Sequence, residues 1–218
     1  MRIIVIGAVA AGTSAAAKAR RNHDAAGIAI YERDKDISYS ACGLPYYLGG
    51  KIDDIDELTP RDQEFFKKKY NIDVFTGYEV LKISPQSQEI TVRKLDTNEE
   101  FKDKYDKLII ATGASPFVPD IKGINSPNVF FIRNVQSARN IKNFIVENRP
   151  QSAVIAGSGF IGFEMLENLC ATGIDVTIVE KMNKITPNLD EDMAAFLERK
   201  TLKYLRILVF QKYMPAGS

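Results

Sequence analysis

Cys42 is the residue of this 218-residue chain whose type and setting best suit chemistry. It lies in the segment SYSACGLPYY, residues 38–47, where serine, glycine and proline predict a turn and not a core strand. Pro45 suits the first turn of a helix, which would place Cys42 near a helix N-terminus, where the dipole favours the nucleophilic thiolate. The second cysteine, Cys170, falls in an apolar helical pattern, so we expect a buried and unreactive thiol there.

Two glycine-rich turns, residues 7–12 and 157–162, form the other chemically suggestive pattern. Glycines permit a sharp turn and close helix packing, and the helix N-terminus then faces a pyrophosphate while a later acid accepts from ribose hydroxyls. The acids Glu32 and Glu180 follow at 20 residues after Gly12 and 18 after Gly162, near the expected spacing. Around the turns we predict strands over residues 2–6, 28–31, 153–156 and 175–179, and helices over residues 13–21 and 163–171.

The two fingerprints differ in completeness. Gly157, Gly159 and Gly162 match the full G-x-G-x-x-G pattern, whereas the first turn has Gly7 and Gly12 but Val9 between them. An alternative is that both are ordinary glycine-rich turns of a doubly wound fold that bind nothing. Because each turn is followed by its acid in a strand–turn–helix setting, the pair favours two nucleotide sites.

The residues between the two units predict further elements. Thr59 and Pro60 are typical of a helix start, and that helix would run to about Tyr70. Ser137 is expected to cap another helix that ends before Pro150. Apolar runs predict a hairpin over residues 80–83 and 89–93 and a buried strand over residues 107–111. The fold class is therefore α/β, with two Rossmann-like βαβ units and a small β-hairpin insertion.

Composition excludes several classes of function. Lys plus Arg number 29 and Asp plus Glu number 28, a balance that argues against charge-driven binding of nucleic acid. No apolar run reaches the 18 or so residues of a membrane span, and the N-terminus is interpreted as a strand and not a signal peptide. Two cysteines are too few for a disulfide scaffold, so we expect a cytoplasmic protein. A single histidine, His23, leads us to expect no metal site.

Four motifs together resemble a known family: IVIGAVAAGTSAAAKARR, YERDKDISYSACGLPYYLGG, YDKLIIATGASP and VIAGSGFIGFEMLENL. They resemble the single-cysteine branch of the flavin-dependent pyridine nucleotide–disulfide oxidoreductases, and most closely the coenzyme A-disulfide reductases. The resemblance implies a glutathione-reductase-like fold, FAD and NAD(P)H as cofactors, a coenzyme A-type disulfide as substrate and a homodimer. It also implies an FAD-binding domain over residues 1–118, a connector with a helix over 119–150 and an incomplete NAD(P)-binding domain over 151–218.

The resemblance assigns roles to particular residues. Cys42 would be the redox cysteine beside the flavin, and Phe160 an aromatic side chain that swings over it. Glu164 matches an acid that follows the third glycine, although an acid in the first turn of a helix is also favoured by the dipole alone. The other residues implied in FAD binding are Gly7, Val9, Ala10, Ala11, Gly12, Glu32, Arg33, Ser38, Ser40, Ala111, Thr112 and Gly113, and those in NAD(P)H binding are Gly157, Gly159, Ile161, Gly162 and Glu180.

The substrate can be narrowed further by comparison within the family. Tyr47 stands where two-cysteine reductases have their second cysteine, so the oxidised state should be a mixed disulfide or a sulfenic acid. Ala10 stands where related NADH peroxidases and oxidases have a histidine, which favours coenzyme A disulfide or a similar thiol or persulfide. An NADH oxidase that reduces oxygen and a non-catalytic nucleotide-binding fragment remain the alternatives. Glu180 predicts NADH over NADPH, and Lys181 would offset that preference.

The resemblance also bears on the C-terminal end. The family continues well beyond residue 218, and residues 201–210 lack the glycine expected before a following strand. We therefore expect a truncated chain that either self-associates or binds FAD weakly.

Overall fold

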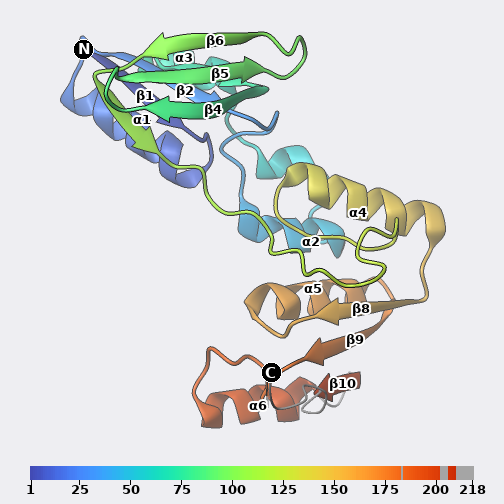
Figure 1. The fold of residues 1–218 in the computed structure, drawn as a ribbon. Coiled ribbons are helices and arrows are strands. Elements are labelled where there is room, and N and C mark those ends of the chain that lie inside the picture. Colours follow the sequence, from blue (N-terminus) through green and yellow to red (C-terminus); the bar gives the residue numbers. More distant parts are fainter. Residues whose placement is uncertain (183, 202–205, 210–218) are drawn as a thin grey trace, which may run out of the picture. The chain divides into compact units, whose positions relative to one another are not determined.

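The computed structural model describes residues 1–182, 184–201 and 206–209. Within them the chain forms two compact units, shown in Figure 1. The first unit combines Met1–Ala41 with Ile55–Asn125. The second combines Cys42–Asp54 with the described residues from Ser126 onward. Both predicted βαβ units are confirmed, one in each compact unit, and each contributes its own parallel sheet.

The first unit is built on a parallel sheet in the order β3-β2-β1-β7. Strand β1 is a nearly unbroken apolar run because both of its faces are covered. Ile3 and Val5 pack with Phe66 on the side of helices α1 and α3, whereas Ile4 packs with Val92 of an antiparallel sheet. The elements are β1 (Arg2–Ile6), α1 (Ala10–Asn22), β2 (Gly27–Glu32), α3 (Gln63–Tyr70), β3 (Asp73–Thr76) and β7 (Lys107–Ile110), with a 3-10 turn, η2, at Ile55–Leu58.

The predicted hairpin is part of a three-stranded antiparallel sheet of β4 (Tyr78–Ser84), β5 (Glu89–Lys94) and β6 (Glu100–Lys104). The third strand was not predicted because its sequence, EFKDK, contains one apolar residue, Phe101, in an otherwise charged run. Phe101 packs beside Tyr31 and Tyr78, at ring-centroid distances of 6.3 and 6.2 Å. Contact with the neighbouring sheet, and not local propensity, therefore determines this strand.

Asp103 of β6 links the antiparallel sheet to the parallel one. It accepts a hydrogen bond from the Tyr31 hydroxyl at 2.7 Å and from Arg2 Nε at 3.0 Å, and it also pairs with the terminal guanidinium nitrogen of Arg2. Burial, together with the hydrogen bond that the Tyr31 hydroxyl donates to Asp103, raises the pKa of Tyr31. The phenol consequently stays protonated and continues to donate to the carboxylate.

Replacing Asp103 by asparagine is expected to lower the free energy of unfolding by about 1–3 kcal/mol, because two donors lose a charged acceptor. Urea denaturation measures this effect. Glu100→Gln is the matched control, since the Arg93–Glu100 pair on the same sheet is more exposed than Asp103, with 37% and 47% of the two side chains accessible against 16% for Asp103. Loss of the Arg93–Glu100 pair should cost at most about 1 kcal/mol. Equal unfolding midpoints for the two variants would contradict the linking role of Asp103.

The second unit contains a parallel sheet in the order β10-β9-β8 among its described residues. Its core joins Leu166 and Leu169 of α5 to Val176 and Ile178 of β9, and Leu48 of α2 is fully buried among them. Helix α2 therefore packs in this unit although segments of the first unit both precede and follow it in the chain. The elements are α2 (Leu44–Leu48), α4 (Val135–Asn148), β8 (Ser152–Ala156), α5 (Phe160–Ala171), β9 (Asp175–Glu180), α6 (Glu191–Thr201) and β10 (Arg206–Val209).

Two predicted helix starts were wrong, each by about three residues. The cap of α3 is Asp62, whose side chain accepts from the Phe65 amide at 2.7 Å, whereas the Thr59 hydroxyl donates to the Asp56 carbonyl. In α4 the cap is Asn134, and Ser137 forms the return half of a capping box with it. In both cases a better side-chain acceptor lies three residues from the predicted cap.

Helices α1 and α5 also start earlier than predicted, at Ala10 and Phe160. The predicted starts were placed after Gly12 and Gly162, on the assumption that these glycines belong to the turn. Both glycines instead lie inside the first turn of their helices. The described part of the chain has no helix that is long and apolar enough to cross a bilayer.

Candidate functional site

The first glycine turn is held in a shape that only glycine permits. Gly7 has a φ of +104°, in the left-handed region, and a Cβ there would collide with the Ala111 carbonyl. A Cβ on Gly12 would collide with the Gly7 carbonyl. Ala111 itself is fixed by a 2.8 Å hydrogen bond from its amide to the Ile6 carbonyl. The predicted second turn at 111–113 therefore lies directly against the first glycine.

The second glycine turn repeats this geometry in part, although a Cβ on its first glycine, Gly157, would meet no atom of the described residues within 4 Å, its chain neighbours aside. Gly157 has a φ of +101°, and a Cβ on Gly162 would collide with the Gly157 carbonyl. A Cβ on Gly159, the middle glycine, would meet no atom of the described residues within 4 Å, its chain neighbours aside. Protein packing thus requires Gly162, whereas the middle glycine borders open space, as expected where a ligand approaches the backbone. The first unit has half-buried Val9 at this middle position.

Both helices that follow the turns begin without a side-chain cap. The cap positions are Val9 for α1 and Gly159 for α5, and neither makes a side-chain hydrogen bond to the helix. The cap residues therefore do not supply the first amides of the two helices with the usual side-chain acceptor. Helices of 13 and 12 residues with such free ends suit a bound phosphate group.

The two acids brace the glycine turns. Glu32 accepts from the Ala8 amide at 2.7 Å and from the Asp34 amide at 2.9 Å. Glu180 accepts from the amide and the hydroxyl of Ser158, at 2.8 and 2.7 Å, and from the Met182 amide at 2.8 Å. The acids were predicted as ribose ligands, a role that stays a prediction. The hydrogen bonds from the turn amides to these two carboxylates were not predicted. The spacing between each acid and its glycine turn is the sequence feature that could have indicated them.

Glu180 is almost completely buried, with 6% of its surface exposed. Burial alone would raise its pKa, but the hydrogen bonds from Met182 and Ser158 outweigh burial and lower the pKa below its usual value. Because the folded-state pKa lies below the unfolded one, the carboxylate stabilises the fold at neutral pH. This contribution is lost as the pH falls through the folded-state value.

The repeat between the two units extends beyond the predicted acids. Ser38 and Thr186 each lie six residues after the acid of their unit, and each adopts a left-handed φ, of +50° and +47°. The Ser38 amide donates to the Ala8 carbonyl at 2.8 Å, and the Thr186 amide donates to the Ser158 carbonyl at 3.2 Å. In both units the loop after the acid therefore returns to the glycine turn. Thr186 was not among the predicted residues.

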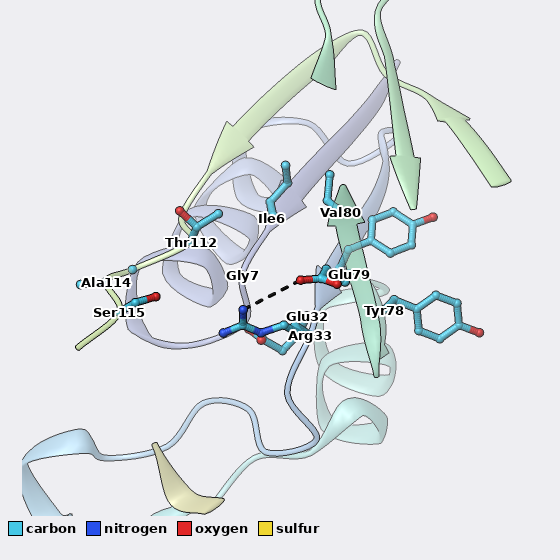
Figure 2. Close-up of a pocket in the computed structure, with 12 residues that line it drawn as sticks. Ile6, Gly7, Glu32, Arg33, Tyr78, Glu79, Val80, Thr112, Ala114 and Ser115 are labelled. Atoms are coloured by element: carbon cyan, nitrogen blue, oxygen red, sulfur yellow. Dashed lines mark ion pairs between the residues drawn. The ribbon is translucent and has the colours of Figure 1, made fainter. Parts of the chain in front are cut away.

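A pocket of about 240 Å³ opens beside the first glycine turn. Figure 2 shows Thr112 and Ser115 on one side of Gly7 and Glu79 and Val80 on the other. The Arg33 guanidinium lies 3.9 Å from the Glu79 carboxylate at this pocket. Of the predicted residues, the pocket unites Gly7, Glu32, Arg33, Thr112 and Gly113, and it adds Ile6, Tyr31, Tyr78, Glu79, Val80, Ala114 and Ser115.

The pocket residues fit one half of a dinucleotide. Gly7 of the glycine turn and the acid Glu32 line the pocket, and residues from β4 form the opposite wall. The β4 residues were missed because the sequence predicted only a strand near them, and no local signal shows which strand faces the glycine turn. Val9, Ala10 and Ala11, also predicted, lie at the start of α1 and do not line the pocket.

Cys42 lies in a 3-10 turn, η1 (Ala41–Gly43), immediately before α2. Its side chain is exposed and its thiol is free. The prediction of Pro45 in the first turn of a helix is confirmed. The helix has only five residues, so its dipole is small, and activation of Cys42 by that dipole stays a prediction. Ser38 and Ser40 belong to the first unit and Cys42 to the second.

Cys170 was expected to be buried, and it is only partly so. It packs at the edge of the α5 core cluster, and burial raises the pKa of its thiol. Tyr47, which was predicted to stand in place of a second redox cysteine, packs against the same cluster. At the start of α5, Phe160 and Ile161 are exposed. Glu164 is half-buried, and its carbonyl accepts from the Asn168 side chain.

Comparison with known proteins defines the class. A family model described as pyridine nucleotide-disulphide oxidoreductase matches residues 1–207. The chain therefore belongs to this family, whose members bind FAD and NAD(P)H. The fold class expected from the sequence is confirmed by this match and by related solved structures.

Individual relatives carry more specific names. The chain is 38% identical over 192 residues to the coenzyme A disulfide reductase of Staphylococcus haemolyticus, an alignment that covers 88% of this chain and 43% of that protein. It is 35% identical over 210 residues to the NADH oxidase of Methanocaldococcus jannaschii, covering 94% and 47%. The crystal structure of reduced CoADR-RHD from Bacillus anthracis has a TM-score of 0.93 at 40% identity, covering 95% and 38%. The chain thus spans less than half the length of these relatives.

Proposed function

We propose that this protein is an FAD-dependent NAD(P)H oxidoreductase that reduces a small-molecule disulfide of the coenzyme A type through Cys42. The observation that carries the proposal is the setting of Cys42. Its thiol is exposed and free in a turn that follows the first nucleotide unit. Tyr47 stands at the position where two-cysteine reductases have the cysteine that pairs with the first one. A single accessible thiol suits exchange with an external disulfide.

The proposed chemistry is thiol–disulfide exchange at Sγ of Cys42. The thiolate attacks one sulfur of the substrate disulfide, so a mixed disulfide forms and the first thiolate leaves. Two electrons and one proton then break the mixed disulfide, which returns Cys42 to its thiolate and releases the second thiol. When bound, FAD supplies the transfer of these two electrons from NAD(P)H.

The remaining residues bind and orient. Gly7 and Glu32, which line the pocket of Figure 2, would hold the adenosine diphosphate half of FAD together with the start of α1, which follows the glycine turn directly. The start of α5, together with open Gly159 and Glu180, would hold the pyridine nucleotide. Exposed Phe160, at the first position of α5, is placed to contact a ligand at that helix start.

The test measures how much thiol is released for each NADH oxidised, and whether NADH oxidation requires oxygen. The flavin-loaded protein is given NADH with coenzyme A disulfide, glutathione disulfide or cystine, first without oxygen and then with it. We expect two thiols for each NADH oxidised, and a preference for coenzyme A disulfide. NADH oxidation that requires oxygen and releases no thiol would instead support the second candidate, an NADH oxidase, which the Methanocaldococcus jannaschii relative favours.

We also predict a preference for NADH over NADPH. The Glu180 carboxylate is ionised and fixed by Ser158, so it would repel a 2′-phosphate at the ribose. Removing it in Glu180→Gln should lower the Kd for NADPH relative to NADH by about 10-fold, or about 1.4 kcal/mol. Fluorescence titration of the two nucleotides measures the ratio.

The matched control for this prediction is Asp175→Asn. Asp175 is an exposed acid at the opposite end of the same strand, β9, so its removal changes net charge equally without touching the turn. The control should leave the nucleotide ratio unchanged. Equal affinities for NADH and NADPH in the wild-type protein would show that Glu180, with exposed Lys181 beside it, does not discriminate.

A further inference from the structure

The helix that follows Cys42 is too short to be stable by itself. Helix α2 has five residues, fewer than an isolated helix needs in water. Its apolar anchor is Leu48, which is fully buried among Ile141 of α4 and Leu166 of α5. The orientation of α2, and of the turn that carries Cys42, therefore depends on contacts with α4 and α5.

A lysine of α4 binds the C-terminal end of α2. The Lys142 ammonium donates to the Tyr47 carbonyl at 3.1 Å and to the Leu48 carbonyl at 3.3 Å. The last carbonyls of a helix lack intrahelical donors, and a cation there also complements the helix dipole. The same ammonium lies 5.4 Å from the centroid of the Tyr47 ring, within the range of a cation–π contact.

Lys142 makes these contacts in place of an ordinary ion pair. Among the described residues, no carboxylate oxygen lies within 4.0 Å of its ammonium, whereas Lys51, which follows α2, pairs with Glu167 at 2.9 Å. Lys142 is half-buried, and its pairing with two carbonyls satisfies both partners. The positive charge of Lys142 therefore interacts with the C-terminal end of α2 and not with a carboxylate of the described residues.

The residue after α2 is fixed by a second contact. A Cβ on Gly49 would lie 2.6 Å from Oδ1 and 2.8 Å from Cβ of Asn168, so α2 ends against the side of α5 with no space between them. Asn168 is fully buried, and its amide group donates to the Glu164 carbonyl at 2.7 Å. The C-terminal end of α2 thus lies between Lys142 of α4 and Asn168 of α5.

We propose that Lys142 is a positioning residue for Cys42: its ammonium fixes the C-terminal end of α2 and so sets the direction of the turn that presents the thiol. The inference rests on the proposed function, in which Cys42 exchanges with a disulfide. Cys42 lies two residues before α2, so a tilt of this short helix displaces the sulfur. Misplacement of a reacting atom by about 1 Å can slow a reaction by about 100-fold.

The test compares three variants of the flavin-loaded protein. Lys142→Met keeps the length and apolar stem of the side chain but removes the donor, and Lys142→Arg keeps a cation. Lys51→Met is the matched control, because it removes an exposed lysine that also lies beside α2. We expect Lys142→Met to lower kcat for disulfide reduction by at least about 10-fold with the KM for NADH unchanged. Lys142→Arg should recover most of kcat, and Lys51→Met should behave as wild type.

A second readout does not depend on activity. Amide hydrogen exchange over residues 42–52 should become faster in Lys142→Met and stay unchanged in Lys51→Met, while the urea midpoint of the whole protein is retained. Wild-type exchange and wild-type kcat in Lys142→Met would overturn the inference. So would a uniform rise in exchange over the second unit, which marks general destabilisation. A wild-type protein that reduces no disulfide would overturn the proposed function, whereas faster exchange confined to residues 42–52 would still support the hold of Lys142 on α2.

Discussion

Replacing Cys42 by serine is expected to abolish disulfide reduction, with a loss of at least about 1,000-fold in turnover. A hydroxyl cannot exchange with a disulfide, so the mixed disulfide does not form. The side chain is exposed in a 3-10 turn, and serine fits the same turn, so folding and flavin binding should be retained. Anaerobic release of thiol from coenzyme A disulfide measures the loss.

The matched control for this prediction is Cys170→Ser. Cys170 lies partly buried in α5, and no described contact ties it to Cys42. Its replacement should leave turnover within about threefold of wild type, after allowance for stability. Thiol release by Cys42→Ser at the wild-type rate would exclude Cys42 as the exchanging residue, and loss of turnover in Cys170→Ser alone would transfer that role to the second cysteine.

The second large effect is expected at Gly7. Alanine there would place a Cβ against the Ala111 carbonyl and would also hold a side chain at a φ of +104°. Steric overlap and backbone strain together should lower the free energy of unfolding by about 3 kcal/mol or more. The pocket beside the turn would be displaced as well, so flavin binding should be lost. Urea denaturation and flavin absorbance of the purified protein measure the two effects.

Gly27→Ala is the control for Gly7→Ala. Gly27 starts β2 in the same sheet, lies exposed, and an added Cβ would meet no atom of the described residues within 4 Å, its chain neighbours aside. Its replacement should change the free energy of unfolding by less than about 1 kcal/mol, because alanine fits there and also restricts the unfolded chain. If Gly7→Ala were as stable and as flavin-rich as this control, the close approach of Ala111 would have no structural importance.

Local patterns in the sequence were sufficient for the elements that carry the nucleotide fingerprints. The apolar runs of β1 and β8 and the glycines that follow them have few structural solutions, so both βαβ units could be predicted. Helix starts were harder to predict, because Thr59 and Asp62 are both good caps and only the packing of α3 decides between them.

The site could be predicted only where its residues follow one another in the chain. Glu32 and Glu180 were found from their spacing, but their bonds to Ala8 and Ser158 were not, because a pattern of residue types does not show where a carboxylate points. The pocket wall from Tyr78 to Val80 was missed because it depends on how two sheets stack. Strand β6 was missed for the same reason, since Phe101 packs against residues distant in the sequence.

The course of the chain through its two units has a consequence for dissection of the protein. Residues 42–54 leave the first unit, contribute α2 to the second, and return before η2 begins at Ile55. A single cut after Asn125 would therefore not yield two autonomous pieces. The N-terminal piece would carry Leu48 away from the core that buries it, and the C-terminal piece would keep an unfilled hollow between α4 and α5. Limited proteolysis after Asn125 should cut the chain into two fragments that stay associated until denaturant is added.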